Sequence, residues 1–409
     1  MTNREKTART LAVFDEYEKR FAAARLAHPL RQPWLKEDRE DILNVVRDAL
    51  QFEESMIPEI KVLDTRTQIF ESIEVRHQLF ASWEHFYGIN SLFVPEGGGK
   101  KPLIIICPGH AKTGRFGTGY QRMALTLARQ GAYALILENI GQGSRDAFGH
   151  RLVPEVFYCG KNLQGLILAE SCAWIRYMAQ QPFVDEARIG ACGNSGGGTL
   201  TTFLCALAPE LAAIASCGYP NEFSYVLQKE KKHCDCNLLA HVAGRLEMWE
   251  VHSLFAPKPL LLENGIYDNL LPADLFRKNS RKVQTVYDMM NAGSCFCSIP
   301  AKTKHSWETE DIEAIGGFFA RQFGLSQPFP APEESLMAHE EVTLPFPADA
   351  ITTGQMVQNL TGLTAPEGLT LPDIVKPRYQ GKDLDPDSIL PMNGESENMR
   401  IFAQFEYSL

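Results

Sequence analysis

The residues best placed to do covalent chemistry lie in one stretch, RIGACGNSGGGTL (188–200). A short apolar run ends there in GNSGG (193–197), and a helix-compatible segment follows at once. A serine between a strand and a helix, at the apex of a sharp turn, forms a nucleophile elbow, in which glycines let backbone segments approach closely. A glycine-rich loop is the alternative interpretation. The flanking strand and helix favour Ser195 as a nucleophile.

A serine hydroxyl needs a general base, and an acid must orient that base. Where the elbow occurs, the acid and then the histidine follow the serine along the chain. His305 comes between the last expected strand (294–299) and the closing helix, where the base belongs; a surface or capping role is the alternative. Asp268, on the loop after the expected strand 259–263, is the favoured acid, and Glu263 at the end of that strand is its rival.

Acyl transfer also needs donors for the negative charge that develops on the carbonyl oxygen. The backbone N–H of Gly196, directly after the nucleophile, is one candidate. We expect the second to be the N–H of Ala111 in the loop PGHAK (108–112), by analogy with the histidine–glycine loops of esterases. His110 is expected to support this loop and contact substrate, although a plain hydrogen-bonded loop residue is an equal alternative.

Strands and helices alternate between residues 67 and 324, which predicts a mostly parallel central sheet flanked by helices. Residues 1–66 are expected to form a helical extension, and residues 219–257 a cap-like insertion near the site. The expected strands are 69–80, 85–95, 102–107, 133–137, 188–192, 211–217, 259–263 and 294–299, and the expected helices are 11–26, 41–52, 119–130, 163–180 and 307–323.

The C-terminal residues 325–409 carry ten of the 24 prolines, no cysteine and little helical periodicity. This composition predicts an extended arm that packs on the domain or on a partner subunit of a homodimer. A partly disordered tail is the alternative. The apolar residues of its last segment, MRIFAQFEY, favour docking.

Charge and hydropathy narrow the range of partners. The net charge of −10 and the absence of a basic run argue against a nucleic-acid partner. No apolar run approaches the roughly 18 residues of a membrane span, and the N-terminus lacks the apolar core of a signal peptide. We therefore expect a cytoplasmic protein that acts on a small molecule, away from membranes.

The cysteines and the glycine-rich loops do not predict a cofactor. All ten cysteines lie between Cys107 and Cys297 and are expected to be reduced. Two CxC pairs, at 234–236 (beside His233) and 295–297, do not match familiar zinc spacings, so no metal is expected. The loop ENIGQGSR (138–145) has neither GxGxxG nor a P-loop lysine, which argues against a nucleotide. Arg145 and Asp146 are expected to form an ion pair.

Four segments resemble the acetyl xylan esterase-like branch of the α/β-hydrolases, close to the dienelactone hydrolases and cephalosporin-C deacetylases. They are CPGHAKTGR, YQRMALTLARQGAYALILENIGQGSR, VDEARIGACGNSGGG and LFAPKPLLLENGIYDNLLP, and the resemblance covers about residues 68–324. It implies a nucleophilic Ser195, an acidic Asp268 in GxxDxxxP and a basic His305. The chain departs from the pattern at Glu138-Asn139, where an aspartate is usual, and in its GHA oxyanion loop.

The sequence thus predicts an α/β-hydrolase fold and a serine-dependent esterase. The expected substrate is a small carboxylic ester, such as an acetylated sugar, cleaved through an acyl-enzyme without a cofactor. An amide or C–C bond hydrolase on the same triad is one alternative. A non-catalytic binding protein with a hydrolase fold is the other.

Overall fold

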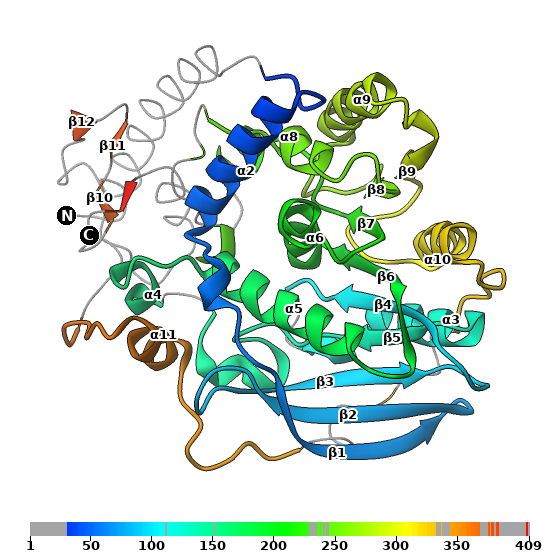
Figure 1. Ribbon diagram of the computed structural model, residues 1–409, viewed down its shortest axis with the longest axis horizontal. Helices are drawn as coiled ribbons and strands as arrows, with labels where there is room; N and C mark the ends of the chain where they lie inside the picture. Colours follow the sequence, from blue (N-terminus) through cyan, green and yellow to red (C-terminus); the bar gives the residue numbers. More distant parts are fainter. Residues whose placement is uncertain are drawn as a thin grey trace.

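The computed structural model describes residues 31–368 apart from 111–112, 151–152, 229–234, 238, 240–241, 243–244, 333–336 and 338–343, together with the strand residues 375–376, 378–379, 382–383 and 406–407. The expected helix at 11–26 lies outside the described residues. A nine-stranded sheet in the order β1-β2-β3-β5-β4-β6-β7-β8-β9 forms the centre of the molecule (Figure 1).

The strands of this sheet are β1 (Lys61–Phe70), β2 (Ile73–Ala81), β3 (Tyr87–Val94), β4 (Lys101–Cys107), β5 (Tyr133–Ile136), β6 (Val184–Asn194), β7 (Ala213–Cys217), β8 (Leu260–Gly265) and β9 (Phe296–Ala301). The helices are α2 (Lys36–Leu50), α3 (Thr118–Gln130), α4 (Pro154–Tyr158), α5 (Leu163–Ala179), α6 (Gly196–Leu207), α7 (Phe223–Gln228), α8 (Met248–Ser253), α9 (Ala273–Met289), α10 (Thr309–Phe323) and α11 (Thr353–Thr361). Two short ribbons pair β10 (Val375–Lys376) with β13 (Glu406–Tyr407) and β11 (Arg378–Tyr379) with β12 (Lys382–Asp383).

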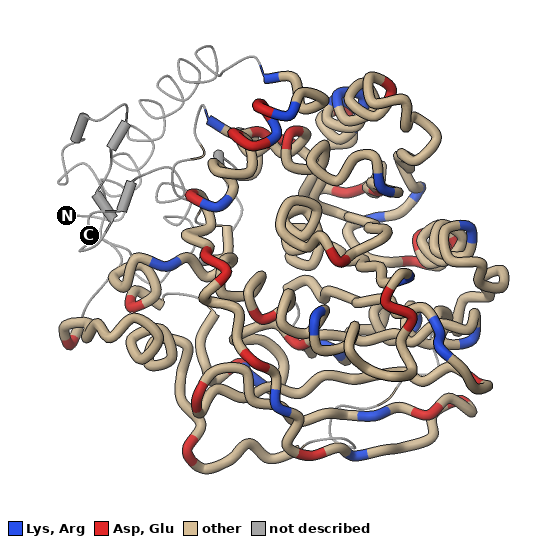
Figure 2. The backbone as a smooth tube through the Cα atoms, in the orientation of Figure 1, with Lys and Arg blue, Asp and Glu red and all other residues tan. Residues whose placement is uncertain are grey.

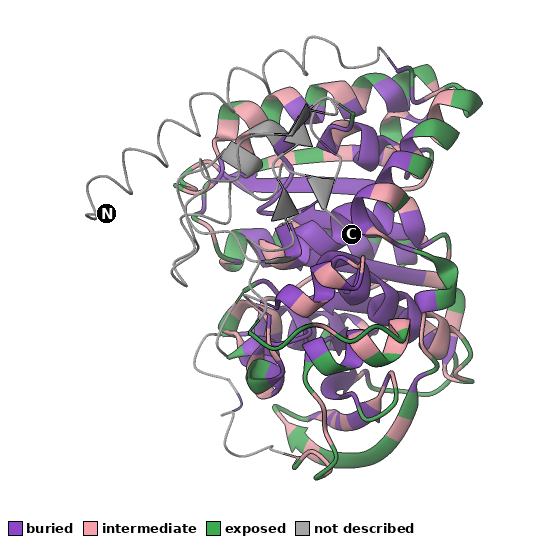
Figure 3. Ribbon diagram, turned by 90° about the vertical axis from the view of Figure 1, so that its left-hand side faces the viewer, coloured by how far each residue is buried: buried purple, intermediate pink, exposed green. Residues whose placement is uncertain are grey.

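Strands β4 to β9 are parallel, and β1 to β3 extend the sheet in antiparallel order. The apolar run of β4 is buried on both faces because side chains alternate along a strand. Leu103 and Ile105 pack into one hydrophobic cluster with α2, α5, α6 and α9, whereas Ile104 and Ile106 pack into the other with α3 and α10. Figure 3 shows this buried centre between helices with exposed outer faces. The predicted mostly parallel sheet flanked by helices is confirmed.

The N-terminal part of the sheet differs from the expectation. The expected boundary at residue 67 falls inside β1, and the segment 69–80 is divided by a turn at Glu71-Ser72, where φ is 48° and 63°. β1 is an edge strand with most of its side chains exposed, so its sequence lacks the apolar alternation of a half-buried strand. Its residues 61–68 therefore escaped detection, whereas residues 69–70 belong to the expected strand 69–80.

The described part of the C-terminal arm packs on its own domain. Thr353 Oγ1 donates to Gly149 O at 2.8 Å, Asp349 pairs with His85 at 2.6 Å, and the ring of Phe346 lies against Phe148. These contacts hold residues 346–353 against the domain. The expected contact with a partner subunit stays a prediction.

Charged residues do not gather by sign on the described part of the chain. Lys and Arg are interspersed with Asp and Glu along the whole tube (Figure 2). Among the described residues, no helix has the length and apolar character needed to cross a membrane.

Candidate active site

Ser195 occupies the turn between β6 and α6, at the carboxyl edge of the parallel strands. Its backbone has φ 60° and ψ −117°, a sparsely populated conformation for a non-glycine residue. The N–H of Ser195 donates to Cys217 O at 3.1 Å, which ties the turn to the neighbouring strand β7. A Cβ on Gly193 would lie 2.3 Å from Gly197 O, so only glycine fits there. The predicted strand–turn–helix context is therefore present.

The structure brings the three predicted catalytic side chains together from different strand ends. His305 Nε2 lies 2.8 Å from Ser195 Oγ, and His305 Nδ1 lies 2.6 Å from Asp268 Oδ2. The Asp268 side chain is fully buried, and its other oxygen accepts the N–H groups of Leu270 and Leu271 at 2.7 and 3.1 Å. An ionised Asp268 requires Nδ1 of His305 to donate, which leaves the Nε2 lone pair facing the serine hydroxyl.

The rival acid, Glu263, faces a different group. Its carboxyl is buried beside Asp311 and Cys217, and both burial and the Asp311 charge raise its pKa well above the usual value. Burial also raises the pKa of Asp311 to about 6. Two carboxyl groups in one apolar site favour a shared proton. Of the two candidates, Asp268 is the one that contacts His305.

The Glu263–Asp311 pair makes a pH-dependent contribution to stability. Folding raises both carboxyl pKa values. Above about pH 4 the folded protein therefore holds more protons than the unfolded chain. As a result, the free energy of unfolding falls as the pH rises through about 6. We expect Glu263→Gln, which mimics the protonated acid, to reduce this loss by roughly 1–2 kcal/mol. Urea unfolding at pH 5 and pH 8 measures the effect.

Glu313→Gln is the matched control, because Glu313 is exposed on the same helix as Asp311 and should leave the pH dependence unchanged. An equal loss of stability between pH 5 and pH 8 in Glu263→Gln and in the wild-type protein would show that the pair titrates normally.

The loop after β4 lies directly against the nucleophile. A Cβ on Gly109 would lie 2.6 Å from Asn194 O and 2.9 Å from Ser195 Cβ. The Gly109 N–H donates to Tyr120 Oη at 2.6 Å, and Asn139 Nδ2 donates to Pro108 O at 2.7 Å. Gly196, one predicted oxyanion donor, begins α6 beside this loop, whereas Ala111, the other, lies outside the described residues.

Buried charges fix the neighbouring loop that carries Asn139. Glu138 Oε1 accepts Arg115 Nη1 at 2.7 Å and Ser144 N at 3.0 Å. Arg145 pairs with Glu170 through two contacts of 2.7 and 3.0 Å. The expected Arg145–Asp146 ion pair is therefore wrong, since Asp146 is exposed and sequence adjacency does not bring two side chains together.

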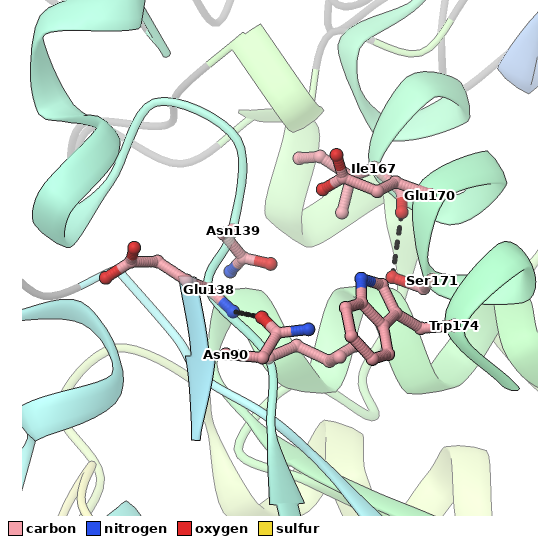
Figure 4. A pocket seen from close by; sticks show the side chains of 8 residues that line it. Asn90, Glu138, Asn139, Ile167, Glu170, Ser171 and Trp174 are labelled. Atoms are coloured by element: carbon pink, nitrogen blue, oxygen red, sulfur yellow. Dashed lines mark hydrogen bonds between the residues drawn. The ribbon is translucent and has the colours of Figure 1, made fainter. Parts of the chain in front are cut away.

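A cavity of about 10 Å³ lies behind this loop, enough for about one water molecule. Figure 4 shows Glu138 donating its N–H to Asn90 Oδ1 at 2.9 Å, with Trp174 and Ser171 on the helix opposite. This space is too small for a substrate. Asn139 and Tyr120, which hold Pro108 and Gly109 in place, carried no motif and were missed in the sequence.

The ring of His110 lies against Gly196, next to Ser195, and its further contacts were not foreseen. A Cβ on Gly196 would lie 2.6 Å from His110 Nδ1 and Cε1, so the ring covers the start of α6. On its other side, His110 Nε2 lies 3.0 Å from His150 Nε2 and 3.2 Å from Cys236 Sγ. The predicted substrate contact of His110 stays a prediction.

Comparison with known proteins supports this geometry at the level of the fold. No family model matches the chain. The solved structure of Methylesterase BT1017 is 22% identical, with a TM-score of 0.62 over 85% of this chain and 78% of that one. The chain has the α/β-hydrolase fold. The predicted fold class is thereby confirmed.

Two further proteins are similar to this chain. A solved structure from Bacteroides fragilis described as a "putative acetyl xylan esterase" is 14% identical, with a TM-score of 0.57 over 69% of this chain and 81% of that one. The Bacillus subtilis protein named "Putative hydrolase YtaP" is 25% identical over 182 residues, 44% of this chain. The match spans 61% of that relative's length.

Proposed function

We propose that this α/β-hydrolase is a serine-dependent carboxylic-ester hydrolase. The observation that carries the proposal is the continuous contact from Ser195 Oγ through His305 to the buried carboxylate of Asp268. A serine activated by an oriented imidazole is the arrangement that acyl transfer requires.

In the proposed reaction, Ser195 Oγ attacks the ester carbonyl while His305 Nε2 takes the hydroxyl proton. Asp268 stabilises the resulting imidazolium. The N–H groups of Gly196 and Ala111 stabilise the oxyanion, since Gly109 already donates its N–H to Tyr120. His305 then protonates the leaving alcohol, and a water molecule, deprotonated by the same nitrogen, hydrolyses the acyl-enzyme.

The proposed substrate is an ester with a small acyl or alkoxy group, such as an acetylated or methyl-esterified sugar. Gly109 and His110 crowd the nucleophile, which favours a small group at the carbonyl. The names of two solved structures with the same fold, a methylesterase and an acetyl xylan esterase, support the ester class.

A fluorophosphonate probe followed by peptide mass mapping tests the proposal. The expected result is a single label on Ser195, together with hydrolysis of p-nitrophenyl acetate and of acetylated or methyl-esterified sugars in preference to the matching amides. A folded protein that takes no label on Ser195 would contradict the proposal. A labelled protein that cleaves only amides or diketones would retain the triad but overturn the substrate class.

A further inference from the structure

Three side chains with metal-binding atoms converge behind the oxyanion loop. They are His110 from the loop after β4, His150 from the loop before α4, and Cys236 from the insertion at 219–257. Their candidate ligand atoms all lie within 4.8 Å of one another. Segments far apart in the sequence thus present two imidazole nitrogens and one sulfur to a common point, a combination that zinc and similar cations favour.

The hydrogen bonds of His150 orient it as metal-binding histidines are oriented. His150 Nδ1 lies 2.6 Å from Ile140 O, and because a carbonyl oxygen can only accept, Nδ1 carries the proton. Nε2 of His150 therefore carries a lone pair, which lies 3.0 Å from His110 Nε2 and 3.2 Å from the amide nitrogen of Gln142. Donation of the second ring nitrogen to a backbone carbonyl is the usual support of a histidine that binds a metal through the first.

The distances are close to those of a tetrahedral site. Zinc–ligand bonds of about 2.0–2.3 Å place two nitrogens about 3.3 Å apart and a nitrogen and a sulfur about 3.6 Å apart. The observed separations are 3.0 Å between the two Nε2 atoms and 3.2 Å between His110 Nε2 and Cys236 Sγ. These two separations differ from the tetrahedral values by a few tenths of an ångström, and the ligand atoms of His150 and Cys236 lie within 4.8 Å of each other.

The state of Cys236 decides whether the cluster can bind. Cys236 is disulfide-bonded in this structure, so the expectation of a reduced thiol is wrong at this position. Only a thiolate is a metal ligand. We propose that, once this disulfide is reduced, Cys236 joins His110 and His150 in binding a thiophilic divalent cation such as Zn²⁺. In the reduction, a dithiol gives two electrons and two protons to the disulfide of Cys236, and its own thiols are oxidised to a disulfide. In the second step, the metal ion displaces the proton of the Cys236 thiol.

The site lies where a bound ion can affect the neighbouring loop. The ion would bind the Nε2 edge of His110, while the Nδ1 edge covers Gly196. A metal would thus fix the ring and the start of the oxyanion loop, which makes His110 and His150 positioning residues. The sequence predicted no metal because the three ligands come from separate segments and form no spacing motif.

Titration with Co²⁺ of protein reduced with dithiothreitol, then desalted without oxygen, tests the proposal. The expected result is one equivalent of bound cobalt with a sulfur-to-cobalt absorption band. Cys236→Ser should abolish the band, and His150→Gln should weaken binding at least about tenfold. The unreduced protein should not bind. Cys297→Ser, in the second CxC pair and only half-buried, is the control that should bind as the wild type does.

Two outcomes would overturn the site: reduced wild-type protein that takes up no stoichiometric Co²⁺, or a Cys236→Ser variant with an unchanged band. Circular dichroism and a thermal unfolding curve for each variant separate lost binding from lost folding. Metal binding is measured by absorption and the nucleophile by fluorophosphonate labelling. A failure of the metal site with Ser195 still labelled can therefore be distinguished from a loss of labelling with the metal still bound.

Discussion

Ser195→Ala is expected to lower kcat/KM for p-nitrophenyl acetate by roughly 10⁴-fold or more, because the proposed acyl-enzyme forms on Ser195 Oγ. The substitution removes only Oγ, whose partner is His305 Nε2 at 2.8 Å. Alanine keeps the same Cβ, so the cost of φ 60° at this turn is nearly unchanged. The variant should therefore unfold at almost the same urea concentration as the wild type. Initial rates with purified proteins of matched concentration measure the loss.

Ser298→Ala is the matched control, since Ser298 is exposed on β9 and far in sequence from the elbow. It should retain the wild-type rate. If Ser195→Ala kept more than roughly a hundredth of the wild-type kcat/KM, the proposed nucleophile would be wrong.

The proximity of Ser195, Asp268 and His305 was predictable from the sequence because each residue follows an element with a strong local signal. The apolar strands that become β6, β8 and β9 are easy to recognise, and the carboxyl ends of parallel strands meet at one edge of the sheet. Ser195, Asp268 and His305 follow these three strands, so the topology alone brings them together. The motifs then only had to select one residue on each loop.

The supporting contacts were not predictable in the same way. Asn139 and Tyr120 hold the oxyanion loop through single hydrogen bonds to backbone atoms, and such bonds leave no pattern in the sequence. The Arg145–Glu170 pair joins residues 25 positions apart on separate elements. His150 and Cys236, which contact His110, lie 40 and 126 positions from it in the sequence. These contacts depend on tertiary structure rather than on local propensity.

The elbow itself depends on glycine as much as on serine. Gly197→Ala is expected to destabilise the protein by about 3 kcal/mol or more, against a total stability of about 5–15 kcal/mol. The added Cβ would lie 1.8 Å from Cys107 O and 2.6 Å from its carbonyl carbon. Both atoms belong to the backbone of β4, so no side-chain rotation relieves the clash. Only a movement of α6 away from β4 can, and that movement also displaces Ser195 from His305.

Gly98→Ala is the matched control for this clash. Gly98 has no heavy atom within 4 Å of the added Cβ and no positive φ, so its substitution should change the free energy of unfolding by less than about 0.5 kcal/mol. Urea unfolding of both variants gives the two values, and fluorophosphonate labelling of the fraction that remains folded reports the nucleophile. The prediction fails if Gly197→Ala is as stable as Gly98→Ala and its Ser195 is labelled at the wild-type rate. Cys107 O would then lie farther from Gly197 than in this structure, where an added Cβ would come within 1.8 Å of it. The reason for glycine at this position would then have to be sought in the conformation of the backbone rather than in the space around it.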